Sequence, residues 1–162
     1  MKYAVAAFTL AAIFLNVAQV SANDFKTGLS AYQKRDYATA LRIWTPLAEK
    51  GDADAQYNLG HMYRLGKGVM KDYEEAADWY LRASKNGAAD AQFNLSVMYR
   101  YGRGVRRSNL TAHMWANIAG SQGHMDATQL KKTLARKLTP DDLTEAHRRA
   151  KVCMESNFKT CD

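Results

Sequence analysis

The 162-residue sequence has few cysteines, prolines and acidic residues, and each shortage excludes a class of protein. Two cysteines exclude a disulfide-dense miniprotein, and two prolines exclude a collagen-like chain. Hydrophobic residues make up 47% and charged residues 24%, which excludes a disordered tail protein. Only 16 Asp and Glu face 23 Lys and Arg, for a formal net charge of +7. The composition indicates one globular unit with excess positive charge.

Long hydrophobic runs are missing except at the start of the chain. Residues 4–17 are apolar, follow Lys2 and precede Val20-Ser21-Ala22. A membrane-spanning helix needs about 20 apolar residues, so this run is too short to span. A basic start, a short apolar segment and small residues at the end are typical of a secretory signal peptide. We expect residues 1–22 to be removed after Ala22 and the mature protein to be periplasmic or secreted.

The positive charge is unevenly distributed along the mature sequence. Residues 23–99 hold ten basic and ten acidic side chains, whereas residues 100–162 hold twelve basic and six acidic ones. Because an exported protein meets little nucleic acid, the excess favours anionic lipid headgroups, envelope polymers or acidic proteins as partners. A role in solubility alone stays open. The candidate basic patch comprises Arg103, Arg106, Arg107, Lys131, Lys132, Arg136 and Lys137.

The sequence repeats itself at an offset of 36 residues, since residues 53–69 match residues 89–105. The second halves of the two units align at the same offset, as Trp79 with Trp115 and Gly87 with Gly123 show. Such a period is typical of a solenoid, in which each unit buries its apolar face against its neighbours.

Helical spacing of apolar residues predicts two helices in each unit. Ala55, Leu59 and Tyr63 share one helix face, and Ala76, Trp79, Tyr80 and Ala83 share another. Glycines at matching positions, Gly66 with Gly102 and Gly68 with Gly104, predict a left-handed end to the first helix and a tight loop. Each unit is therefore expected to form a helical hairpin.

The predicted organisation has five parts. A signal peptide covers 1–22, an N-terminal hairpin without the glycine loop covers 23–52, repeat 1 covers 53–88 and repeat 2 covers 89–124. Residues 125–162 form a C-terminal capping hairpin and tail, with a helix start at Thr139-Pro140. The expected fold class is all-α, an α-solenoid of about four antiparallel helical hairpins.

The repeated pattern resembles the Sel-1-like repeat, a relative of the tetratricopeptide repeat with a longer loop. The matching residues of the first unit are Ala53, Ala55, Leu59, Gly60, Tyr63, Gly66, Gly68, Val69, Asp72, Ala76 and Trp79. The resemblance implies a right-handed superhelix whose concave side, lined by the first helix of each hairpin, holds a partner protein or peptide. It also implies a non-catalytic adaptor without a cofactor, of the kind that bacteria export for envelope signalling, assembly or host interaction.

By analogy with tetratricopeptide hairpins, the resemblance also implies partner-binding positions. Repeat 1 would present Asp54, Tyr57, Asn58, His61 and Arg64, and repeat 2 would present Asp90, Phe93, Asn94, Val97, Arg100 and Tyr101. Asparagine can bond a peptide backbone and arginine can meet a carboxylate, while the ring offers apolar contact. A structural alternative stays open, in which the asparagines bond between adjacent first helices and the rings are partly core.

Catalytic and metal-binding patterns are scarce. The four histidines lie on different segments without a pair at metal-ligand spacing, so we expect no metal site. Ser156 and Lys159 fit the Ser-x-x-Lys of penicillin-recognising enzymes, but the accompanying motifs are missing, and a hydrolase is the least favoured function.

The only two cysteines are eight positions apart, at Cys153 and Cys161. On one continuous helix they would lie about 12 Å apart, beyond the roughly 7 Å that a disulfide permits. A bridge therefore requires the last helix to end near Ser156 or Asn157. We expect such a bridge in an oxidising compartment.

These observations lead to an exported scaffold that binds a protein or peptide and catalyses nothing. The alternative is attachment to an anionic envelope polymer or membrane surface through the basic C-terminal half. Neither the partner's identity nor the oligomeric state follows from the sequence.

Overall fold

The computed structural model describes residues 24–161, and every regular element in that range is helical. The predicted signal peptide and its cleavage point therefore lie outside the described residues. A helical segment over residues 24–33 comes first. The helices that follow are α2 (Tyr37–Glu49), α3 (Ala53–Leu65), α4 (Tyr73–Lys85), α5 (Ala89–Tyr101), α6 (Asn109–Ser121), α7 (Met125–Ala135) and α8 (Pro140–Glu155).

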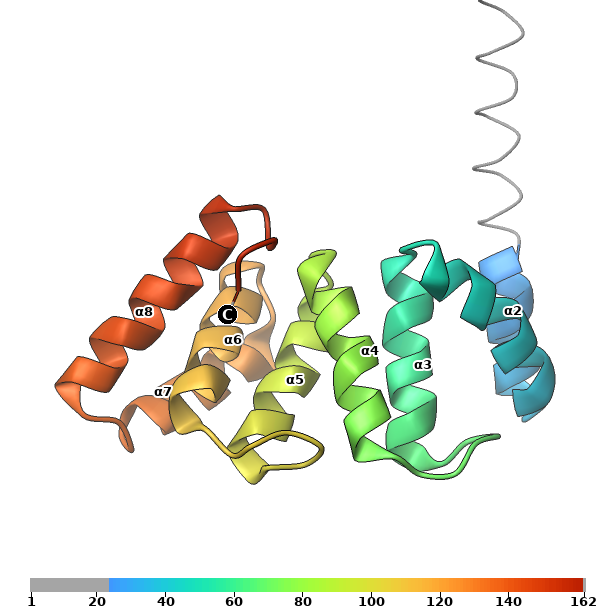
Figure 1. Cartoon of the computed structure of the whole chain (residues 1–162), viewed down its shortest axis with the longest axis horizontal. Coiled ribbons are helices and arrows are strands. Elements are labelled where there is room, and N and C mark those ends of the chain that lie inside the picture. Colours follow the sequence, from blue (N-terminus) through green and yellow to red (C-terminus); the bar gives the residue numbers. More distant parts are fainter. Residues whose placement is uncertain (1–23, 162) are drawn as a thin grey trace, which may run out of the picture.

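The helices alternate in direction and stack into an elongated solenoid (Figure 1). From α2 to α6, each helix packs against the next one in the chain. The connections within hairpins gather along the lower edge in Figure 1, which we call the hairpin-loop edge: residues 34–36, 66–72, 102–108 and 136–139. The connections between hairpins gather along the upper edge: residues 50–52, 86–88 and 122–124. The all-α solenoid expected from the repeat is the observed fold.

The helix ends follow from local sequence chemistry. Asp52 and Asp72 cap α3 and α4 by accepting backbone N–H groups through their carboxylates. Gly66 and Gly102 end α3 and α5 in the left-handed conformation, with φ of 68° and 66°. The predicted C-terminal helix also starts as expected, because Thr139 caps α8 and Pro140 occupies its first turn.

The long loops of the two repeats pack closely onto the preceding hairpin. A Cβ built on Gly104 would lie within contact distance of the Tyr73 backbone, and one on Gly68 would lie 2.6 Å from the Tyr37 Cβ. Both glycines also have positive φ, so no other residue fits without strain. The loops therefore form part of the contact between consecutive hairpins.

Small residues at the 36-residue period let the helices approach. Ala40, Ala76 and Ala112 are completely buried at matching positions in the second helices of three hairpins. Ala55, Ala91 and Ala127 do the same in the first helices. Larger buried side chains fill the remaining space in the core, notably Trp44, Tyr80 and Trp115.

The C-terminal end departs from the hairpin pattern. α8 packs mainly against α6 rather than against α7. Its apolar residues Ala150 and Cys153 join the core cluster of Trp115 and Ile118, whereas Leu130 and Leu134 of α7 form a separate cluster with α6. α6 is therefore covered on two sides.

A disulfide joins Cys153 to Cys161. α8 ends at Glu155, and Asn157 and Phe158 follow with positive φ, so the tail turns back as a bridge requires. Both cysteines are buried in the same core cluster as Trp115. The bridge therefore holds the tail against α8. No helix within residues 24–161 has the length and apolar character to cross a membrane.

Candidate partner-binding site

The predicted positions of repeat 1 form an aromatic cluster on the first helices. The ring of Tyr57 lies 5.8 Å from that of Tyr80 and stacks on His61 at 6.4 Å between centroids. The Tyr32 hydroxyl, from the helical segment 24–33, lies 3.3 Å from Nδ1 of His61. Burial lowers the pKa of His61, and the nearby Arg64 and Lys67 lower it further. His61 is therefore a neutral side chain held by two tyrosines at neutral pH.

Tyr57 lies close to the first helix of repeat 2, since Asp90 and Asn94 of that helix both affect the pKa of its hydroxyl. Burial raises the pKa of Tyr57, and Asp90 raises it further, so the hydroxyl stays protonated. The sequence left open whether the asparagines bond between adjacent first helices, and the bond observed for Asn94 goes to the Asp90 carbonyl of its own helix.

The predicted positions of repeat 2 meet the start of α7. Asp90 lies 3.3 Å from Nε2 of His124, and the Phe93 ring stacks on the His124 ring at 4.5 Å. His124 is the N-cap of α7, and its Nδ1 accepts the N–H of Ala127 at 3.2 Å. In the neutral ring the proton is therefore on Nε2, where it is donated to Asp90. α7 thus contributes to the same face as α3 and α5.

These contacts join residues from four successive first helices. We call the resulting strip the first-helix face: Tyr32, Tyr57, His61, Asp90, Phe93, Asn94 and His124. It combines ring faces with carboxylate, amide and imidazole groups, and it runs across the boundary between the repeats. Such a strip can hold an extended segment through side-chain and backbone hydrogen bonds.

Several predicted positions already bond or pack within the protein. Asn58 and Asn94 each donate to a carbonyl of their own helix, that of Asp54 at 2.7 Å and of Asp90 at 2.9 Å. Val97 is half-buried and packs with Phe93 against the core cluster of α6 and α7, so its role is partly structural.

The two predicted arginines have different environments. Nε of Arg64 donates to the Tyr80 hydroxyl at 3.2 Å, and burial raises the pKa of Tyr80 to about 12 against the opposing effect of Arg64. Arg100 instead lies over the Tyr101 ring at 5.1 Å. Tyr101 ends α5 at the hairpin-loop edge, so the structure places this pair away from Phe93 and His124.

Sequence reasoning missed Tyr32 and His124. Tyr32 belongs to the first helix of the N-terminal hairpin, and the short loop after this helix puts it out of the 36-residue register. His124 is the residue after Gly123, the last position matched by the repeat. A capping position followed by an apolar helical pattern was the available signal for His124.

The predicted basic patch is divided by the structure. Arg103, Arg106 and Arg107 lie in the loop before α6, and Arg136 and Lys137 lie in the connection before α8. Nζ of Lys131 bonds Oδ1 of Asn117 at 3.0 Å, and Lys132 is exposed on α7. The loop residues share an edge with lysines of the N-terminal half, which the sequence did not group with them.

The residues considered for chemistry are engaged in structural contacts. The Ser156 hydroxyl donates to the Cys153 carbonyl at 2.8 Å and accepts the N–H of Thr160 at 2.9 Å. His113 is 1% exposed and lies against the His147 ring at 5.1 Å. Within residues 24–161 no group of three or more His, Cys, Asp or Glu side chains is placed to hold a metal ion.

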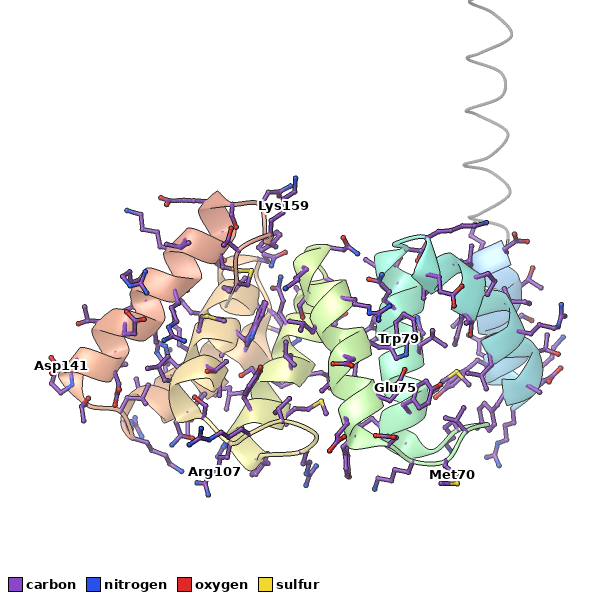
Figure 2. The ribbon with its side chains drawn as sticks, in the orientation of Figure 1. Met70, Glu75, Trp79, Arg107, Asp141 and Lys159 are labelled. Carbon is purple, nitrogen blue, oxygen red and sulfur yellow. A yellow bond between two sulfur atoms is a disulfide. The ribbon has the colours of Figure 1, made fainter. Side chains whose placement is uncertain are left out.

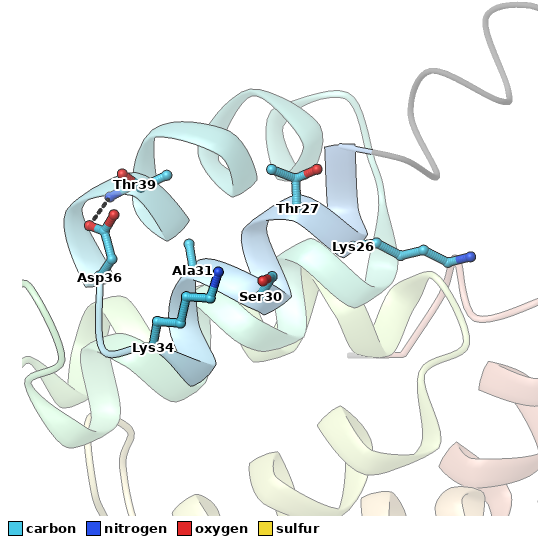
Figure 3. Close-up of a pocket in the computed structure, with 7 residues that line it drawn as sticks. All are labelled: Lys26, Thr27, Ser30, Ala31, Lys34, Asp36 and Thr39. Atoms are coloured by element: carbon cyan, nitrogen blue, oxygen red, sulfur yellow. Dashed lines mark hydrogen bonds between the residues drawn. The ribbon is translucent and has the colours of Figure 1, made fainter.

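A shallow hollow of about 400 Å³ lies between the helical segment 24–33 and α2 (Figure 3). Its lining residues are Lys26, Thr27, Ser30, Ala31, Lys34, Asp36 and Thr39. The bond across it, from the Thr39 N–H to Asp36 at 3.1 Å, is the cap of α2. None of these residues belongs to the first-helix face.

Solved structures with related folds support the solenoid assignment. The chain is similar to c5321, a protective antigen of uropathogenic Escherichia coli strains displaying an SLR fold, with 27% identity and a TM-score of 0.80 over 85% of this chain and 31% of that one. It is also similar to a Sel1 repeat protein from Oxalobacter formigenes, with 33% identity and a TM-score of 0.65 over 68% of this chain and 45% of the other.

A curated relative shares a shorter segment. The chain is 39% identical over 49 residues to the ERAD-associated E3 ubiquitin-protein ligase component HRD3 of Candida glabrata, which is 30% of this chain and 6% of that protein. This chain thus spans less than half the length of each of these three proteins. A family profile described as the Sel1 repeat matches residues 53–87 and 89–124. Residues 53–87 and 89–124 are therefore two Sel1 repeats, within a fold typical of protein-protein interaction scaffolds.

Proposed function

We propose that this protein is an exported, non-catalytic scaffold that binds a protein or peptide through the first-helix face. The observation that carries the proposal is the row of neighbouring side chains across the repeats, from His61 and Tyr57 to Asp90, which raises the pKa of Tyr57, and on to His124. Since these side chains come from separate hairpins, a partner lying across them would contact several repeats at once.

The chemistry of the face suits an extended polypeptide. Rings of Tyr57 and Phe93 lie at the same position in successive repeats, and each is partly buried, so each is already ordered before a partner binds. Ordered aromatic side chains lose little entropy on binding and are frequent anchors of interfaces. Exposed carboxylates at Asp54 and Asp90 favour a partner segment with basic residues.

The test compares partner capture by paired variants in intact cells. Tyr57→Ala with Phe93→Ala removes both rings, and we expect at least about a tenfold loss of the captured partner. Because both rings also touch core clusters, a second variant, Asp54→Arg, changes only an exposed side chain, which lies next to the face and three residues before Tyr57 on α3. The matched control is Asp78→Arg, an exposed acid on α4.

We expect both face variants to lose capture of the partner and Asp78→Arg to retain it. Circular dichroism should show intact helices in all three variants. Capture that survives both face variants, or that falls equally in the control, would contradict the proposal.

The exported location rests on residues 1–22, whose apolar run and Ser21-Ala22 end are typical of a cleaved signal. The Cys153–Cys161 bridge agrees with an oxidising compartment. Cell fractionation with N-terminal sequencing checks this part. We expect a periplasmic or secreted chain that begins at Asn23 without free thiols, and a cytoplasmic chain that keeps Met1 would contradict it.

A further inference from the structure

We propose that the hairpin-loop edge docks onto the surface of an anionic lipid bilayer. This edge is distinct from the first-helix face and involves different residues. The sequence grouped the basic residues of the C-terminal half, whereas this edge groups basic residues from both halves that lie together in the fold.

The edge concentrates positive charge from all four hairpin connections. Residues 34–36, 66–72, 102–108 and 136–139 hold nine Lys and Arg against two Asp. The three connections on the upper edge hold one Lys against one Asp. The nine cations are Lys34, Arg35, Lys67, Lys71, Arg103, Arg106, Arg107, Arg136 and Lys137.

The acids near this edge do not neutralise it. Asp36 and Asp72 are helix N-caps, so their carboxylates face backbone N–H groups. The first turns of α4 and α8 add four more acids, and the cations still outnumber them nine to six. The ion pairs identified between residues 24 and 161 involve none of the nine cations. All nine except Lys67 are exposed.

Tyrosine rings hold part of this charge in a regular arrangement. Nζ of Lys67 lies 5.5 Å from the centroid of the Tyr37 ring, and the guanidinium of Arg103 lies 5.8 Å from that of Tyr73. Both members of the second pair follow the first by 36 residues, so the same contact recurs between consecutive hairpins. The loop cations are therefore positioned by the stack and face one surface together.

Exposed apolar side chains occupy the same edge. Among residues 24–161, five large hydrophobic side chains are exposed, and three of them lie here: Met70 at 89%, Tyr101 at 54% and Leu65 at 41%. Met70 lies in the loop between α3 and α4, next to Lys71, and Figure 2 shows it at the lower margin together with Arg107. Lys159 lies at the opposite margin.

The combination of cations and exposed apolar groups decides the kind of partner. A soluble anionic polymer would neutralise the charge but leave Met70 in water. A bilayer offers phosphate groups to the cations and the headgroup–acyl boundary to Met70 and Tyr101. The edge thus matches an anionic lipid surface in both charge and apolar content.

The test measures cosedimentation of the chain from Asn23 onward with lipid vesicles. The apolar run 4–17 is left out because it would enter lipid by itself, and the three core clusters lie within residues 25–161. Vesicles of phosphatidylcholine alone are compared with vesicles containing about 30% phosphatidylglycerol. We expect at least about tenfold stronger binding to the anionic vesicles, weakening as salt rises.

Two variants of equal charge change separate the edge from net charge. Arg106→Glu, Arg107→Glu and Lys137→Glu reverse three exposed cations of the edge. Lys26→Glu, Lys50→Glu and Lys159→Glu reverse three exposed cations elsewhere. We expect about a tenfold loss or more for the first and a smaller change, about threefold or less, for the second. Equal losses, or no preference of the parent chain for anionic vesicles, would overturn the proposal.

Met70→Gln separates a bilayer from an anionic polymer. Because Met70 is almost fully exposed, the substitution should leave stability unchanged. We expect a loss of about threefold or more on anionic vesicles and none on soluble dextran sulfate. An unchanged affinity for vesicles would mean that charge alone is recognised, and the bilayer proposal would be wrong.

Discussion

Repeats 1 and 2 share a period and a backbone, but they fill the space between their two helices differently. In repeat 1, Gly60 faces Tyr80, and a Cβ on Gly60 would lie 2.8 Å from the Tyr80 ring. At the matching positions of repeat 2, Ser96 donates to the Ala112 carbonyl at 2.8 Å, and Ala116 takes the place of the tyrosine. A large side chain opposite glycine has been exchanged for a small one opposite serine.

The N-terminal hairpin extends the comparison. Its Gly28 faces Trp44, and a Cβ there would meet the indole ring. Trp44, Tyr80 and Ala116 follow one another at 36-residue intervals, so the side chain shrinks along the stack while its partner on the first helix grows from glycine to serine. The period fixes where helices meet, and the two residues at each meeting point differ together, with a large ring opposite glycine in two hairpins and alanine opposite serine in the third.

This exchange also changes the surface. The Tyr80 hydroxyl holds Arg64 of repeat 1, whereas Ala116 offers no hydroxyl to Arg100 of repeat 2. Arg100 lies instead over Tyr101, beside Arg103. Two arginines at the same position in the repeat therefore serve different surfaces.

The largest expected effect comes from breaking the pair of repeat 1. Tyr80→Ala should cost about 3 kcal/mol or more of unfolding free energy because it leaves a cavity. Gly60→Ser alone should cost about 2 kcal/mol because its Cβ meets the ring. The double variant reproduces the pair of repeat 2, and we expect it to be less destabilised than the sum of the two by about 1 to 3 kcal/mol.

Urea unfolding of the single and double variants measures this coupling. Gly60→Ser combined with Asp78→Ala, an exposed residue of α4, serves as a control in which the two effects should add. If the effects of Gly60→Ser and Tyr80→Ala simply add, the two side chains are not coupled, and this difference between the repeats has no energetic basis in their packing.

A second difference should make repeat 2 sensitive to acid. Its buried His113 stands where repeat 1 has Ala77. Burial lowers the pKa of His113 to about 4, with His147 and Lys131 contributing. As the pH falls, His113 is protonated in the unfolded chain before it is protonated in the folded one. The free energy of unfolding is therefore highest above about pH 6.5 and decreases toward pH 4, by on the order of 3 kcal/mol.

The measurement is the free energy of unfolding between pH 7 and pH 4 for the parent chain and for His113→Gln. We expect a flatter profile for the variant, with the difference confined to this range. Below it, both profiles should fall together, since two arginine hydrogen bonds lower the pKa of Glu145 to about 2. Parallel profiles from pH 7 to 4 would exclude His113 as the cause.

The smallest effect concerns helix caps. Asp52 caps α3 by accepting the Ala55 N–H at 2.8 Å, whereas the matching residue of α5 is Ala88, which has no side-chain cap. Ala88→Asp should stabilise by about 1 kcal/mol, and Asp52→Ala should destabilise by a similar amount. Thermal unfolding of both variants checks this, and shifts of the same sign would argue against it.

Much of the fold could be predicted from the sequence because alanines and glycines recur at an offset of 36 residues. The left-handed Gly66 and Gly102 and the cap at Thr139 are local features, and local rules predict them. The end of α8 near Ser156 follows instead from the spacing of the two cysteines. The packing of α8 on α6 depends on residues far apart in the sequence, and no local pattern indicates it.

The candidate site was only partly predictable for a similar reason. Tyr57, Asp90, Phe93 and Asn94 lie at matching positions within the repeats, so the period finds them. Tyr32 and His124 come from the irregular hairpins at either end, and only packing brings them to the face. The basic residues were grouped along the sequence, although the solenoid gathers cations from every hairpin onto one edge.

Site-specific photo-crosslinking in intact cells tests the central claim, that the first-helix face binds a partner, most directly. A photoreactive residue is placed at Asp54 or Asn94 on the first helices, and at Asp78 on α4 as the control. We predict that both first-helix positions capture the same protein and that the control captures none of it. Capture from Asp78 without capture from either first-helix position would contradict the account.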